Sequence, residues 1–143
     1  MKIELIVDGV AFGEGEIDSF DYDSEVFENS KGAVTTLTLT IHGNIFVNVM
    51  TGTENTLKLE EWSRVSASIA QCYRSVEIKA KDEGMIVRNI KFPYAFVVDY
   101  IEEYGDIEGD AIGRFTLKVR QKGDLVNSDV NYNSIEISGG FEA

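Results

Sequence analysis

The sequence predicts a mainly β protein, a small β-barrel or two-sheet sandwich with one α-helix at about residues 53–70. Three observations predict it: apolar and polar residues alternate along several short segments, one longer segment has helical spacing, and turn residues separate these segments. The length of 143 residues suits one compact domain, 1–143, and 43% hydrophobic residues are enough for one core.

Several segments have the period of two that is typical of half-buried strands. Ile3, Leu5 and Val7 alternate with charged or polar neighbours, which predicts the first strand. Between residues 35 and 42, leucine or isoleucine alternates with threonine, whose β-branched side chain favours strands. Further strands are predicted over residues 73–80, 85–92, 94–100, 115–120 and 134–138.

The connections between these segments also carry information. The turn at residues 81–84 joins two strands into a hairpin. Pro93 lies between two strand segments, where its missing N–H removes no ladder hydrogen bond. Residues 94–100 are nearly all apolar, which predicts burial on both faces or at an interface.

One segment, 53–70, has helical periodicity and contains neither glycine nor proline. Its apolar residues recur at steps of three, three and four, which places them on one helical face: Leu59, Trp62, Val65 and Ile69. Thr53 or Asn55 is available as the N-cap. We expect this helix to cover an open end or face of the barrel, with Trp62 as its main anchor.

Two acidic segments are predicted to be loops, residues 13–32 and 102–110, although the beginning of the first has some strand character. The first also contains Phe20, Tyr22 and Phe27. Aromatic side chains gain most when they are buried against a partner, so this segment indicates an adhesive surface.

The chain carries 25 acidic and 13 basic residues, for a net charge of −12. Nucleic acids and anionic membranes attract basic proteins, so neither is an expected partner. Residues 1–30 hold nine acids and one base, whereas residues 61–98 hold six bases and four acids. This segregation is compatible with oppositely charged patches between identical copies, and also with surface charge that only maintains solubility.

No residue set predicts catalysis, a cofactor or a metal. His42 is the only histidine and Cys72 the only cysteine, and the local sequence activates neither. The glycine pattern lacks a phosphate-binding loop, and zinc ligands are too few. Residues 21–25 and 106–110 have acids at alternate positions, as calcium loops do, but lack the sixth-position glycine and twelfth-position acid. Carboxylate pairs remain conceivable among 25 acids, but we do not expect an enzyme.

Part of the chain resembles the Hcp-like tube proteins of type VI secretion systems, extracellular contractile injection particles and related phage tails. The similarity covers roughly residues 53–122. It lies in the segments FPYAFVVDY (92–100), EEYGD (102–106) and GRFTLKVRQK (113–122), and, for the family's helix and following strand, in LEEWS (59–63) and CYRSVEI (72–78).

This resemblance implies a small barrel or two-sheet sandwich whose copies form hexameric rings that stack head to tail into a hollow tube. The implied partners are other copies of the chain, together with sheath, spike or baseplate proteins and effector cargo. The chain would be made and assembled in the cytoplasm, without a signal peptide, and then exported as part of the particle.

We predict that the acidic segments and a basic group form self-assembly contacts. The residues concerned are Asp18, Phe20, Asp21, Tyr22, Asp23, Glu25, Phe27, Glu28, Lys79, Lys81, Arg88, Lys91, Glu102, Glu103, Asp106, Glu108 and Asp110. Two alternatives remain. The first is a small β-barrel that binds a ligand or a protein as a monomer or dimer, and the second is a calcium-binding protein.

Overall fold

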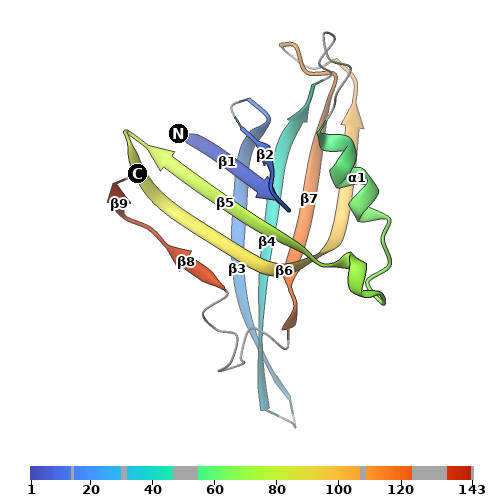
Figure 1. Ribbon diagram of the computed structural model, residues 1–143, viewed down its shortest axis with the longest axis vertical. Helices are drawn as coiled ribbons and strands as arrows, with labels where there is room; N and C mark the ends of the chain where they lie inside the picture. Colours follow the sequence, from blue (N-terminus) through green and yellow to red (C-terminus); the bar gives the residue numbers. More distant parts are fainter. Residues whose placement is uncertain (14, 30–31, 47–54, 107–108, 124–134, 143) are drawn as a thin grey trace.

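The computed structural model describes residues 1–13, 15–29, 32–46, 55–106, 109–123 and 135–142. The elements in chain order are β1 (Lys2–Val7), β2 (Val10–Phe12), β3 (Ile17–Asn29), β4 (Gly32–Ile45), α1 (Thr56–Ser63), the 3-10 helix η1 (Ala70–Cys72), β5 (Arg74–Asp82), β6 (Met85–Tyr104), β7 (Gly113–Gln121), β8 (Glu136–Ser138) and β9 (Phe141–Glu142). The fold is mainly β with a single α-helix among the described residues, as the sequence predicts (Figure 1).

The strands pair in the order β2-β1-β5-β6-β7-β4-β3, and β8 and β9 pair with β6. Every one of these pairings is antiparallel. Strand β6 is long and belongs to both halves of the sheet. Its residues 85–92 pair mainly with β5, and its residues 95–104 pair with β7.

The sequence predicts two strands on either side of Pro93, but the structure has one continuous strand, β6. Pro93 lies where β6 changes from one partner to the other, between the pairs Val76–Phe92 and Arg74–Ala95. The next residue is held by β7, because the Tyr94 N–H donates to the side-chain oxygen of Gln121 at 3.2 Å. Proline is tolerated at this position because the register shift leaves its nitrogen outside the ladder.

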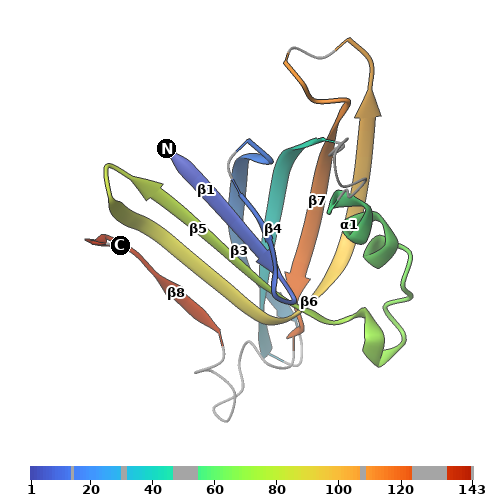
Figure 2. The ribbon, with the colours of Figure 1, turned by 45° about the horizontal axis from the view of Figure 1, so that its top comes forward.

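Because β6 is shared, the sheet folds over itself into two layers. We call β1, β5 and residues 85–92 of β6 the front layer, and β3, β4, β7 and residues 95–104 of β6 the back layer. The front layer runs diagonally across the steeper strands of the back layer (Figure 1), and the turned view shows the same two layers (Figure 2).

The core lies between these layers, where the apolar positions of the alternating segments meet. The buried cluster includes Leu5 and Val7 of β1, Leu39 and Ile41 of β4, Ile78 of β5, Phe92 of β6, and Phe115 and Leu117 of β7. Alternation therefore predicts the buried faces of β1, β4 and β7 correctly. On β1 and β7 the other face is exposed or only partly buried, whereas on β4 the other face includes Thr38, which is buried as well.

The prediction of a loop over residues 13–32 is wrong, because Ile17–Asn29 forms β3. Phe20 and Tyr22 pack against the core, while Asp21 and Asp23, each of which follows one of these aromatic residues, are exposed. This is the period of two of a half-buried strand, and the high acidic content masks it in the sequence. The segment is acidic on one face only.

The helix is shorter than predicted, since α1 ends at Ser63. Beyond it the chain is rich in serine, and Ser66 Oγ accepts a hydrogen bond from the Ser68 N–H at 3.2 Å, a local alternative to the helical ladder. Ile69, predicted to lie on the apolar face, is 46% exposed. Asn55 makes no side-chain cap, and Thr53 lies outside the described residues.

The helix closes the core through one aromatic residue. Trp62 is 1% exposed and belongs to the core cluster together with Leu59. Its indole N–H donates to the Cys72 carbonyl at 2.6 Å, and the guanidinium of Arg74 lies 5.9 Å from the ring centroid. Of the described helices, none combines the length and the apolar character needed to cross a membrane.

Candidate self-assembly interface

The back layer has two margins that pair with no strand among the described residues. On one side, β3 pairs only with β4. On the other side, residues 96–104 of β6 pair with β7 alone, because the pairing of β6 with β5 ends at Ala95. Unpaired strand margins present backbone donors and acceptors that another chain can complete.

Apolar side chains are exposed along and beside the β6 margin. Tyr94, Val98, Ile101 and Tyr104 are 47%, 38%, 46% and 62% exposed. The alternative that residues 94–100 are buried on both faces is therefore wrong for the single chain, and the interface remains as the prediction. Large apolar residues gathered along a free strand margin are typical of a surface that another protein covers.

A second exposed apolar group lies at the far end of the β3–β4 hairpin, which extends beyond the other strands at the bottom of Figure 1. Val26, Phe27 and Val34 are about half exposed or more. Glu25 and Glu28 are exposed beside them. This end combines exposed apolar and acidic side chains, and its role in self-assembly stays a prediction.

The predicted acidic residues of β3 do not all face the same way. Asp21, Asp23 and Glu25 lie opposite three threonines of β4, Thr40, Thr38 and Thr36. Asp18 is tied within the chain, because its Oδ1 accepts a hydrogen bond from Asn44 Nδ2 at 2.8 Å. The structure therefore places an acidic row along the exposed face of the back layer.

His42 lies on the same face, between β3 and β7. Its Nδ1 is 3.2 Å from the Thr116 hydroxyl, and its Nε2 is 3.7 Å from Asp21 Oδ2. In the described part of the chain, no three histidine, cysteine or acidic side chains gather in a way that could hold a metal ion.

The second acidic segment is partly strand rather than loop, because Glu102 and Glu103 belong to β6. Glu102 accepts hydrogen bonds from the hydroxyls of Tyr100 and Tyr104 at 2.7 and 2.9 Å. Glu103 lies opposite Arg114 of β7. Asp106 and Asp110 are exposed beyond the strand, and Glu108 lies outside the described residues.

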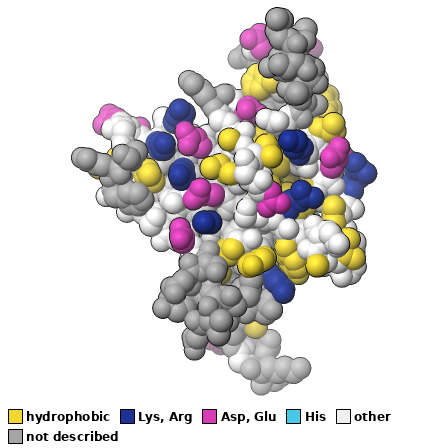
Figure 3. Space-filling model, viewed as in Figure 1, with side chains coloured by type: hydrophobic (Ala, Val, Ile, Leu, Met, Phe, Trp, Pro, Cys, Tyr) yellow, Lys and Arg dark blue, Asp and Glu magenta, His cyan; other side chains and the backbone are white. Residues whose placement is uncertain are grey.

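The predicted basic residues are mostly matched by acids of the front layer. Lys79 lies 3.9 Å from Glu77, and Lys81 lies 3.7 Å from Glu4. Lys91 is opposite Glu77 in the register. Figure 3 shows basic and acidic side chains interspersed on the face that carries β1 and β5, so this face is mixed in charge rather than a basic patch.

Arg88 differs from these lysines because it lines a cavity. The cavity has a volume of about 640 Å³ and opens between β3 of the back layer and the front layer. We call it the seam cavity. Its apolar lining comes from Ile3, Phe20, Tyr22, Ala80, Ile90 and Ile137.

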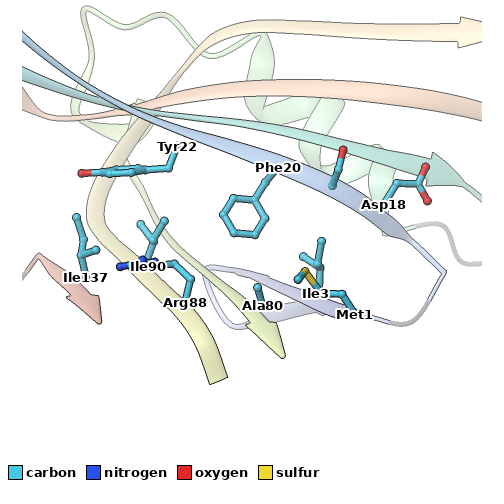
Figure 4. Close-up of a pocket in the computed structure, with 10 residues that line it drawn as sticks. Met1, Ile3, Asp18, Phe20, Tyr22, Ala80, Arg88, Ile90 and Ile137 are labelled. Atoms are coloured by element: carbon cyan, nitrogen blue, oxygen red, sulfur yellow. The ribbon is translucent and has the colours of Figure 1, made fainter. Parts of the chain in front are cut away.

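Figure 4 shows how the seam cavity is built. Phe20 and Tyr22 extend from β3 on one side, and Ile90 and Ala80 lie opposite them on the front layer. Partial burial raises the pKa of the Tyr22 hydroxyl above its ordinary value. The sequence could not predict this cavity, because its walls come from five separate strands and from Met1, the residue before the first of them.

The sequence matches no family model and no curated protein, but the fold is similar to solved structures. Hcp1 from Flavobacterium johnsoniae aligns with a TM-score of 0.57 and 17% identity over 100% of both chains. A chain of the extended sheath–tube complex of PVC, an extracellular contractile injection system, aligns with a TM-score of 0.53 and 9% identity over 97% of this chain and 89% of that chain. A chain of the anti-feeding prophage (AFP) baseplate, 6-fold symmetrised, aligns with a TM-score of 0.50 and 16% identity over 96% of this chain and 91% of that chain.

The similarity to Hcp1 extends over the whole chain, whereas the sequence resemblance covers only residues 53–122. The amino-terminal strands, including the acidic β3, are therefore part of the same fold. The chain has the fold of the Hcp-like tail tube proteins.

Proposed function

We propose that this chain is a structural protomer of the inner tube of a contractile injection machine, in which six copies form a ring and rings stack head to tail. The back layer with its two free margins carries the proposal. Free margins are an aggregation hazard in an isolated chain, and a ring removes the hazard by pairing each margin with that of a neighbour.

The strand directions support a ring built from one repeated contact. The back layer contains four alternately directed strands, so β3 and residues 95–104 of β6 run in opposite directions. If copies are arranged side by side around an axis, β6 of one copy lies next to β3 of the following copy and pairs with it antiparallel. The number six comes from the family resemblance and agrees with the sixfold symmetry of the AFP baseplate.

In this ring the exposed face of the back layer lines the lumen, because the front layer and α1 cover its other face. The lumen wall then carries the threonines of β4 between an acidic row on β3 and basic side chains of β7, among them Lys118 and Arg120. A polar wall of mixed charge suits a passive conduit for effector cargo, because it offers no large apolar surface to which cargo would adhere.

The same proposal assigns the outer partners. Sheath, spike or baseplate proteins are the expected contacts of the assembled tube, and the chain acts after assembly in the cytoplasm and export in an extracellular particle. The role is structural rather than catalytic, which is in keeping with the tube and baseplate assemblies to which the fold is similar.

Ring stacking is expected to depend on charge. We propose that the acidic ends of the β3–β4 hairpin and of β6 face the bases Lys79, Lys81 and Lys91 of copies in the neighbouring ring, and that Arg88 contacts a carboxylate of the neighbour within its own ring. Raising the salt concentration shortens the screening length from about 8 Å at physiological ionic strength to about 3 Å at 1 M, so tubes should shorten into single rings. Sedimentation velocity across a salt series measures this change.

Charge reversal tests the same contacts at fixed salt. Lys79→Glu combined with Lys81→Glu should reduce tube length at low salt, and Lys79→Arg combined with Lys81→Arg, which keeps both charges, serves as the control. Tubes whose length is insensitive to both salt and the double reversal would contradict this assignment.

Native mass spectrometry tests the ring itself. The proposal predicts a species near six times 15.9 kDa at micromolar protein concentration. The alternative function, a β-barrel module that binds a ligand or a protein, is favoured by the seam cavity, whose 640 Å³ lies in the range of small-molecule sites. That alternative predicts a species of one or two chains, which would contradict the ring.

A further inference from the structure

We propose that α1 of one copy packs against the seam cavity of the next copy in the ring, with Leu57 entering the cavity and Glu61 facing Arg88. This inference rests on the ring proposed above and names a second contact within it. The pairing of β6 with β3 of the next copy joins backbone groups at the two strand margins. The contact proposed here is made by side chains on the core side of the back layer.

The seam cavity lies beside the β3 margin. Phe20 and Tyr22 line it from β3 itself, and Ile90 and Ala80 line it from the front layer (Figure 4). It is therefore an open side of the sandwich, reached from the direction in which a neighbour must approach β3. A large apolar cavity open to water at this place leaves apolar surface that a second copy can bury.

Helix α1 lies beside the opposite margin. It contacts β6, and Leu59 and Trp62 anchor it in the core on the side of the back layer that the front layer also covers. Its outer surface has two consecutive features on one helical face: Leu57 is 49% exposed, and Glu61, one turn later, is exposed as well. The helix thus presents an apolar side chain followed by a carboxylate.

Rotation about a ring axis brings these two regions together. When β6 of one copy lies beside β3 of the next, the helix next to β6 and the cavity next to β3 are on the same side of the continued sheet. Both α1 and β1, which forms part of the cavity wall, lie in the upper half of Figure 1 (Figures 1 and 2). With the ring axis placed along the strands of the back layer, which run steeply in Figure 1, rotation keeps this height from copy to copy, so the two regions meet.

The charges of the two regions are complementary. Arg88 contributes the only basic side chain among the described lining residues of the cavity, and it forms no ion pair with a described acid of its own chain. The nearby acid Asp18 is engaged by Asn44. On α1, Glu60 is paired with Arg64 at 2.8 Å, which leaves Glu61 as the available carboxylate of the exposed face. A carboxylate from the neighbour would pair directly with the guanidinium of Arg88.

A charge swap tests this contact. Arg88→Glu and Glu61→Arg should each shift the ring-to-monomer midpoint to at least about tenfold higher protein concentration, and the double variant should recover most of that loss. Native mass spectrometry over a dilution series gives the midpoints, and circular dichroism confirms that each variant folds. Two single variants that assemble like the wild type, or a double variant weaker than either single one, would overturn the inference.

Cross-linking provides a readout that does not depend on affinity. In Glu61→Cys/Arg88→Cys, a short bismaleimide should join neighbouring copies into a ladder of up to six chains on a denaturing gel. Each single variant controls for Cys72, which is buried. Glu61→Cys/Glu77→Cys is the matched control, because Glu77 lies on β5 outside the cavity.

The outcomes separate this inference from the ring proposal. Rings seen by mass spectrometry without a ladder in Glu61→Cys/Arg88→Cys would overturn the helix contact and leave the ring standing. A wild-type protein that forms no ring would contradict the ring, and the helix contact with it. A ladder confined to the Glu61–Arg88 pair is the result that the inference predicts.

Discussion

Replacing Ile101 by aspartate is expected to weaken ring formation by at least about tenfold, equivalent to roughly 1.4 kcal/mol per contact, without lowering the stability of the single chain. Ile101 is 46% exposed and lies on the second half of β6, next to the free margin. Ile101 pairs with Thr116 of β7, so in the ring its side chain would lie on the lumen face, beside the acidic row on β3 of the next copy. An aspartate there would face like charges across the contact between copies, which weakens the contact.

Ile112→Asp is the matched control for this substitution. Ile112 is 48% exposed, close to the value for Ile101, but it lies between β6 and β7 rather than on the margin. Both variants should unfold at the urea concentration of the wild type, and only Ile101→Asp should fall apart on dilution in native mass spectrometry. Equal assembly of the two variants would show that the β6 margin is not part of the ring contact.

Truncation of Trp62 to alanine is expected to reduce the free energy of unfolding by about 3–5 kcal/mol, as is usual for a fully buried tryptophan. Trp62 is 1% exposed and joins α1 to the core, and its indole N–H donates to the Cys72 carbonyl. Alanine would leave a cavity, an unpaired carbonyl and an Arg74 without its aromatic partner. Urea unfolding followed by circular dichroism measures the loss, since Trp62 is the only tryptophan.

Trp62→Phe separates the contribution of packing from that of the hydrogen bond. Phenylalanine keeps most of the apolar volume and removes the N–H donor, so we expect a smaller loss, about 1–3 kcal/mol for the unsatisfied carbonyl and the reduced volume. Equal losses of unfolding free energy for Trp62→Ala and Trp62→Phe would contradict the view that packing of the aromatic side chain anchors the helix. Because α1 lies beside the β6 margin, Trp62→Ala should also weaken ring formation.

The sequence predicts most of the strands because their faces differ in polarity. Residues 35–42 alternate aliphatic and threonine side chains, and they lie within β4 with the aliphatic side chains buried. The same alternation is present in β3, where Phe20 and Tyr22 alternate with acids, but it is not part of the prediction. There the composition favours a loop, and burial of two aromatic side chains against the core outweighs it.

The candidate interface is only partly readable from the sequence. The apolar run at residues 94–100 indicates an interface, and the structure leaves Tyr94 and Val98 exposed. The basic residues are less predictable, since Lys79 and Lys81 meet acids that are distant in sequence or on the same strand. The seam cavity arises only when β3 lies over the front layer, so no local sequence pattern predicts it.

Negative-stain electron microscopy of the purified protein tests the central claim most directly. At micromolar concentration the account predicts annular particles with a stained central hole and sixfold class averages, and stacked columns of them at low salt. Fields that contain only small compact particles of one or two chains, under conditions in which the protein is folded, would contradict it.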